Sequence, residues 1–118
     1  MIPARPFPLK IPPALLAAHT GLRPTDLAYI RAVLAREPAV VQAWIYGSRA
    51  RGTHRPGSDV DLALAGTVSD AAVARLRYAL EETGPLPYCF DLTRLSELGP
   101  AHPLRAQIAA DGLALLPE

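Results

Sequence analysis

GSRARGTHRPGSDVDLAL, residues 47–64, joins two apolar segments of the chain through a loop rich in glycine and arginine. Residues 40–46, which precede it, are rich in β-branched and aromatic side chains and predict a strand that ends at Gly47. Residues 48–51 predict a short helix, residues 52–58 a loop, and residues 60–65 a second strand. The stretch therefore predicts a strand, a tight turn and a second strand that begins beside a pair of aspartates.

Asp59 and Asp61 stand two positions apart where the second strand begins. Side chains alternate across a strand, so Val60 and Leu62 should point into a core while both carboxylates point to the opposite face. Their Cα atoms would lie about 6.6 Å apart, close enough for the carboxylates to hold two metal ions in a phosphoryl-transfer site. Mg²⁺ suits such a site because it binds few protein carboxylates and keeps water and phosphate oxygens as its other ligands.

The Gly47-Ser48 turn offers backbone N–H groups to an anion, and glycine lets a phosphate approach the backbone closely. Ser48 could cap the short helix or bind a phosphate, and Arg49, Arg51 and Arg55 could add positive charge for a triphosphate. Each piece alone has an ordinary structural explanation, since Gly-Ser is a common turn and Asp-Val-Asp is typical of a solvated strand edge. Their combination at this spacing favours a site for Mg²⁺ and phosphate.

Asp91 is the candidate for a third carboxylate. It lies between Phe90 and Leu92 in a predicted third strand, residues 88–93. An unpaired buried carboxylate is costly, so we expect a cationic group to face it. With Asp59 and Asp61 it would complete a set of catalytic, metal-binding side chains.

The rest of the chain predicts further helices and one more strand. Thr25 should cap a helix that runs to residue 37, and Ser69 should cap one that runs to residue 83. The remaining predicted elements are helices at 14–19, 94–98 and 103–110 and a strand at 113–116. Five prolines in residues 1–13 argue against regular structure there, so we predict an N-terminal arm over residues 1–24 and one domain over residues 25–118.

Composition excludes several classes of protein. Twelve Lys and Arg against eleven Asp and Glu give a net charge of +1, which gives no reason to expect DNA or membrane-surface binding. No apolar run is long enough for a membrane helix. The single cysteine, Cys89, should be a small buried residue in a reducing environment, and we expect a cytoplasmic protein.

The spacing of Gly47-Ser48 and Asp59-Val60-Asp61-Leu62 resembles the signature of the DNA polymerase β-like nucleotidyltransferase superfamily. The short chain resembles the minimal nucleotidyltransferase branch, in which many members are antitoxins of HEPN-family toxins. The resemblance covers about residues 25–116. It implies an α/β (α+β) fold with a small mixed sheet flanked by helices. It also implies metal ligation by Asp59, Asp61 and Asp91 and phosphate binding by Gly47 and Ser48.

The resemblance further implies a reaction. An acceptor hydroxyl would attack the α-phosphorus of ATP, bound with Mg²⁺, and take AMP while pyrophosphate leaves. For the toxin-antitoxin members, the resemblance implies that the acceptor is a tyrosine of the HEPN partner. The short chain leaves little room for an acceptor-binding domain of its own. Two alternatives remain open: an antitoxin that acts by contact alone, and a nucleotidyltransferase that modifies a small molecule such as an antibiotic. Polymerase activity is disfavoured because nothing predicts a basic groove for a template.

Overall fold

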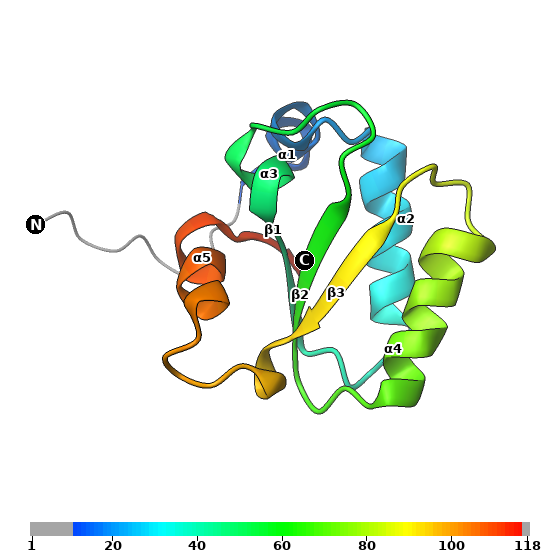
Figure 1. The fold of residues 1–118 in the computed structure, drawn as a ribbon. Coiled ribbons are helices and arrows are strands. Elements are labelled where there is room, and N and C mark those ends of the chain that lie inside the picture. Colours follow the sequence, from blue (N-terminus) through cyan, green and yellow to red (C-terminus); the bar gives the residue numbers. More distant parts are fainter. Residues whose placement is uncertain (1–10, 117–118) are drawn as a thin grey trace, which may run out of the picture.

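The computed structural model describes residues 11–116, which form a four-stranded mixed sheet flanked by helices (Figure 1). The strands are β1 (Gln42–Tyr46), β2 (Val60–Ala65), β3 (Phe90–Arg94) and β4 (Leu113–Leu116). They lie in the order β3-β2-β1-β4, with β1 antiparallel to β2 and to β4, and β2 parallel to β3. The predicted mixed α/β fold is therefore confirmed.

Helices cover both faces of this sheet. They are α1 (Pro13–Thr20), α2 (Pro24–Ala35), α3 (Gly47–Arg51), α4 (Asp70–Arg77) and α5 (Pro103–Asp111), with a π-helical turn η1 (Tyr78–Glu82) and a 3-10 turn η2 (Leu95–Glu97). In Figure 1, α2 and α4 lie on one side of the sheet and α5 lies on the other.

The two faces of the sheet bury different side chains because successive strand residues point in opposite directions. Ile45 and Leu62 belong to the larger core, which includes side chains of α1, α2 and α4. Trp44, Tyr46 and Ala63 belong to a smaller core with Ile108 of α5. Trp44 and Tyr46 are therefore packing residues.

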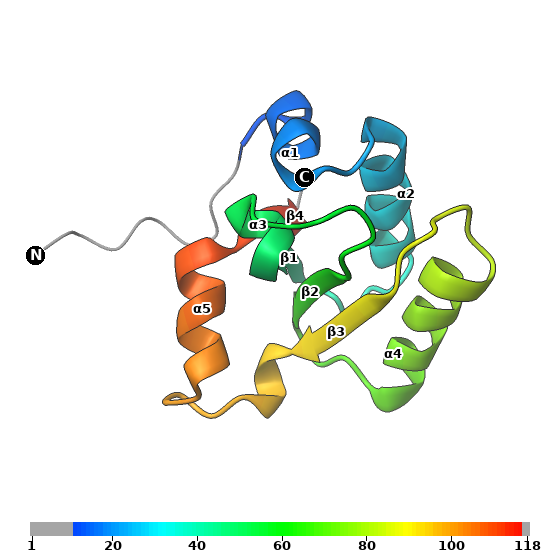
Figure 2. The ribbon, with the colours of Figure 1, turned by 45° about the horizontal axis from the view of Figure 1, so that its top comes forward.

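Helix α1 packs on the rest of the fold. Leu16 is 0% exposed and Leu22, just after the helix, is 2% exposed, and both belong to the larger core. Figure 2 shows α1 above α3 and beside α2. The prolines of the predicted arm that fall within residues 1–10 lie outside the described residues, and the boundary after residue 24 stays a prediction.

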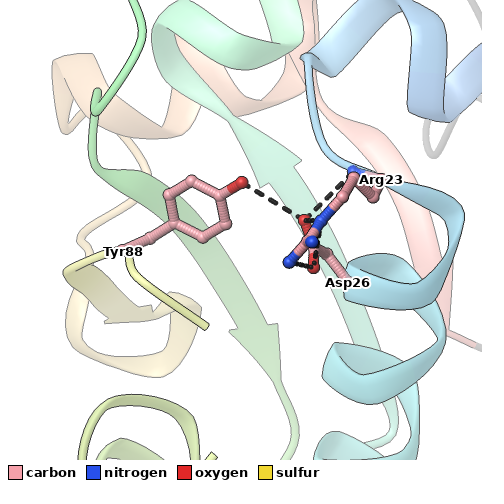
Figure 3. A network of polar contacts seen from close by, with 3 residues as sticks. All are labelled: Arg23, Asp26 and Tyr88. Atoms are coloured by element: carbon pink, nitrogen blue, oxygen red, sulfur yellow. Dashed lines mark hydrogen bonds and ion pairs between the residues drawn. The ribbon is translucent and has the colours of Figure 1, made fainter. Parts of the chain in front are cut away.

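The predicted cap of the second helix is wrong. Helix α2 begins at Pro24 with Arg23 as its N-cap and ends at Ala35, so Thr25 lies inside the first turn. Proline suits this first position because its missing N–H would be unpaired there. The Asp26 carboxylate supplies the cap by accepting the Arg23 backbone N–H at 3.1 Å (Figure 3). Ser69 does cap α4, as predicted, by accepting the N–H of Ala72.

Side chains of α4 and η1 hydrogen-bond to the edge strand β3. The Glu81 carboxylate accepts the Phe90 N–H at 2.6 Å, and Arg77 donates to the Phe90 carbonyl at 2.7 Å. Two side chains thus pair an edge that would otherwise invite another strand. Cys89 was expected to be buried, and this prediction is wrong: β3 begins only at Phe90, and Cys89 is exposed.

No helix among residues 11–116 is long and apolar enough to cross a membrane.

Candidate functional site

Asp61 and Asp91 are direct register partners on the parallel strands β2 and β3. Neighbouring strands lie about 4.8 Å apart, and paired residues of parallel strands point to the same face. Asp59 is exposed just before β2, Asp61 is partly buried, and Asp91 is exposed. The structure therefore brings the third strand's aspartate beside the second strand's pair.

Asp91 differs from its prediction in one respect. It is exposed rather than buried, and none of the ion pairs found among residues 11–116 involves it. Its strand is the last in the sheet, so the side chain has no neighbour on its outer side and needs no buried cation.

The crowding of carboxylates acts on Asp61. Burial, followed by the negative charges of Asp91 and Asp59, raises the pKa of Asp61 to about 6, while Arg51 opposes the rise. Tyr46 is the antiparallel partner of Asp61, and its hydroxyl lies 2.8 Å from Thr93 Oγ1. Burial raises the pKa of Tyr46, and Asp91 and Asp61 add to the rise. The site is an area of negative charge that a cation would neutralise.

Gly47 closes the site on the side of β1. Its φ is 76°, a conformation that glycine adopts without strain, and a Cβ at this position would collide with Asp61 Oδ2. The turn therefore lies directly against the carboxylate. Ser48 follows inside α3 rather than capping it, because the helix begins at Gly47 with Tyr46 as its N-cap.

The three predicted basic residues have separate roles. Arg49 is 2% exposed and donates to backbone carbonyls, so its guanidinium group is held inside the fold. Arg51 is exposed, acts on the pKa of Asp61, and pairs with Asp111 at 3.4 Å. Arg55 is exposed in the loop before Asp59. Of the three, Arg51 is the one that combines exposure with proximity to the carboxylates.

The donor set suits Mg²⁺ better than a metal held entirely by protein. Within residues 11–116, no three His, Cys, Asp or Glu side chains form a ready-made metal site. Asp61 and Asp91 instead offer carboxylates from adjacent strands, with Asp59 exposed at the entrance to β2. Mg²⁺ binds through one or two carboxylates plus water and substrate phosphates, so these residues fit it.

A hollow beside Arg51 has no signature in the sequence. It has a volume of about 680 Å³ and lies between α1, α3 and α5, with Leu15, His19 and Asp111 among its walls. Leu15 is 59% exposed. The approach of α1 to α5 depends on contacts between distant parts of the chain, so no local pattern could have indicated it.

Comparison with known proteins gives the fold an identity. Curated protein sequences give no match. Among solved structures, the fold is similar to a toxin-antitoxin complex crystallised with AMP-PNP, with 24% identity over 75% of this chain and 71% of that chain and a TM-score of 0.63. It is also similar to the MntA-HepT toxin-antitoxin, with 20% identity over 79% of this chain and 71% of that chain and a TM-score of 0.59.

A mutant of that toxin-antitoxin with two Asp-to-Glu substitutions is similar as well, with 22% identity over 75% of this chain and 70% of that chain and a TM-score of 0.61. At these identities the likeness establishes the fold. Residues 29–117 match the family described as polymerase beta nucleotidyltransferase. That match spans the β1 turn and all three aspartates of the site, and the chain therefore belongs to the polymerase beta nucleotidyltransferase family.

Proposed function

We propose that the chain transfers AMP from ATP, in the presence of Mg²⁺, to a hydroxyl group of a partner toxin. The observation that carries the proposal is the pairing of Asp61 with Asp91 across β2 and β3, with the Gly47 turn packed against Asp61. The proposal is supported because carboxylates that could hold a metal lie beside a glycine turn that a phosphate could approach.

Each residue has a role in the proposed reaction. Asp59, Asp61 and Asp91 would hold Mg²⁺, which when bound supplies positive charge to the triphosphate. Gly47 and Ser48 would bind phosphate oxygens through the turn, and Arg51 would add charge from its exposed position. The acceptor oxygen forms a bond to the α-phosphorus, the bond to pyrophosphate breaks, and the Asp91 carboxylate takes the proton of the acceptor hydroxyl.

The proposed acceptor is supported by the similar solved structures and not by the geometry of the site. The similar solved structures are toxin-antitoxin complexes, and one of them was crystallised with AMP-PNP, an ATP analogue. We infer that the partner here is a toxin of the HEPN family and that its acceptor is a tyrosine. A phenol oxygen is a suitable acceptor because it becomes nucleophilic when a neighbouring carboxylate removes its proton.

The test is AMP transfer with α-labelled ATP and Mg²⁺ to the product of the neighbouring gene. Asp61→Asn should reduce labelling of the partner by at least about a hundredfold, because it removes a carboxylate that would hold Mg²⁺ at the triphosphate. Glu82→Gln is the matched control, since it removes an exposed carboxylate outside the site. Labelling that survives Asp61→Asn contradicts the proposal. A toxin that Asp61→Asn still neutralises without labelling indicates an antitoxin that acts by contact.

A further inference from the structure

Arg49 is a buried cation that is held by neutral groups. Its Nη1 donates to the Thr20 carbonyl at 2.8 Å, while Nε and Nη2 donate to the Ser58 carbonyl at 3.1 and 3.0 Å. Its guanidinium carbon lies 4.9 Å from the centre of the Tyr88 ring. The ion pairs found within residues 11–116 do not include Arg49. Burying a cation without a carboxylate is costly, so the carbonyls and the ring must stabilise it.

The contact with Ser58 acts on the first aspartate of the site. The Ser58 carbonyl belongs to the same planar peptide unit as the nitrogen of Asp59. Two donors on this one oxygen fix how the chain enters β2. The preceding turn is closed on itself, because the Ser58 N–H donates to the Arg55 carbonyl and the Arg55 N–H donates to Ser58 Oγ. Arg49 ties this closed turn to α3.

The contact with Tyr88 acts on the third aspartate. Tyr88 precedes β3 and stands three residues before Asp91. Its hydroxyl donates to the buried Asp26 carboxylate at 3.2 Å (Figure 3). The Arg49 guanidinium lies over the face of the same ring, so two contacts hold Tyr88 in place. Arg49 therefore lies between the chain that enters β2 and the chain that enters β3, and it is itself part of the turn that begins at Gly47.

We propose that Arg49 is a positioning residue that sets the relative placement of Asp59 and Asp91, an inference that rests on the proposed function. Arg49 touches neither carboxylate and acts through Ser58 and Tyr88. Lysine cannot replace it, because an ammonium group lacks the planar fork that reaches two carbonyls and stacks on a ring. Second-layer contacts of this kind orient metal ligands and typically change metal affinity by about tenfold to a hundredfold when lost.

The test compares Arg49→Lys with Arg36→Lys, the same substitution at an exposed position of the far end of α2. Hydrogen exchange should show amide protection over residues 53–61 reduced by about tenfold in Arg49→Lys and unchanged in the control. Mn²⁺ binding in the presence of AMP-PNP should weaken by about tenfold. Affinity for AMP-PNP without metal should stay unchanged, whereas a phosphate-ligand role for Arg49 predicts that it falls.

A second pair of variants covers the case in which Arg49→Lys fails to fold. Tyr88→Phe keeps the ring over Arg49 and should retain Mn²⁺ affinity, while Tyr88→Leu removes the ring and should weaken it. Unchanged protection and unchanged Mn²⁺ affinity in Arg49→Lys and Tyr88→Leu overturn the proposal. If the unmodified chain binds neither Mn²⁺ nor AMP-PNP, the proposed function fails, and the hydrogen-exchange comparison alone decides whether Arg49 positions the loop.

Discussion

Two aspartates of this chain, Asp26 and Asp61, have opposite electrostatic environments. Asp26 is 2% exposed, and although burial alone would raise its pKa, hydrogen bonds from Arg23 and Tyr88 hold that pKa below its usual value. Asp61 is partly buried beside two other carboxylates, and its pKa is raised to about 6. One carboxylate has its partners inside the fold, and the other is repelled by Asp91 and Asp59 and attracted by Arg51. This difference separates a carboxylate whose charge the fold stabilises from one whose charge the fold destabilises.

The largest expected effect comes from removing the stabilising carboxylate. Asp26→Ala deletes the cap of α2 and leaves the Tyr88 hydroxyl without its acceptor. We expect the free energy of unfolding to fall by about 2 to 3 kcal/mol, as for the loss of a helix cap together with hydrogen bonds to a charge. Urea unfolding measures this loss, with Asp70→Ala, an exposed aspartate of α4, as the control. A loss equal to that of the control contradicts a structural role for Asp26.

Asp61→Asn should have the opposite sign and raise the stability of the metal-free protein. The folded pKa of about 6 lies above the ordinary value of 3.8, so the stability that protonated Asp61 contributes is full below pH 4 and is lost as pH rises through 6. After allowance for solvent screening, we expect a gain of about 1 to 2 kcal/mol at pH 7. Thermal unfolding at pH 4 and pH 7 checks it, and a gain of equal size at both values contradicts the electrostatic origin.

Mg²⁺ should reverse the penalty at Asp61. A ligand that binds only the folded state at ten times its Kd adds about 1.4 kcal/mol of stability. We therefore expect Mg²⁺ with AMP-PNP to raise the Tm of the unmodified chain at pH 7 and to leave that of Asp61→Asn unchanged. Tyr88→Phe removes only a hydrogen bond to Asp26, which lies outside the site. This slightly destabilised variant should therefore still respond to Mg²⁺. An equal response in Asp61→Asn would remove this carboxylate from the metal site.

Tyr88→Phe should give the smallest effect. It removes the hydroxyl that donates to Asp26 while the ring stays over Arg49. We expect a loss of about 1 kcal/mol, the typical net value of one hydrogen bond. Urea unfolding of the single variant and of the double variant with Asp26→Ala measures the coupling between the two groups. A double variant whose losses simply add would show that the hydrogen bond contributes nothing.

Local patterns predicted most of the framework. The apolar runs located all four strands to within a few residues. The cap of α4 was also predictable, because Ser69 accepts the N–H of Ala72, only three residues further along the chain. Two of the differences from prediction occur where a distant segment of the chain contacts the residue. Arg49 reads as a phosphate ligand beside the turn, but the approach of α1 and Tyr88 gives its guanidinium buried acceptors. Asp91 reads as buried, but β3 is the edge strand, so one side of it is open.

Local sequence alone was enough to predict a strand that begins beside Asp59 and Asp61 and a glycine turn that precedes them, because strand propensity and glycine conformation are local properties. Two features of the site depend on tertiary packing: β3 lies parallel to β2 with Asp91 opposite Asp61, and the Gly47 turn lies against the Asp61 carboxylate. The register between strands depends on packing of the whole sheet against its helices. For that reason the pKa of Asp61, and with it the chemistry of the site, emerges only when the chain is folded.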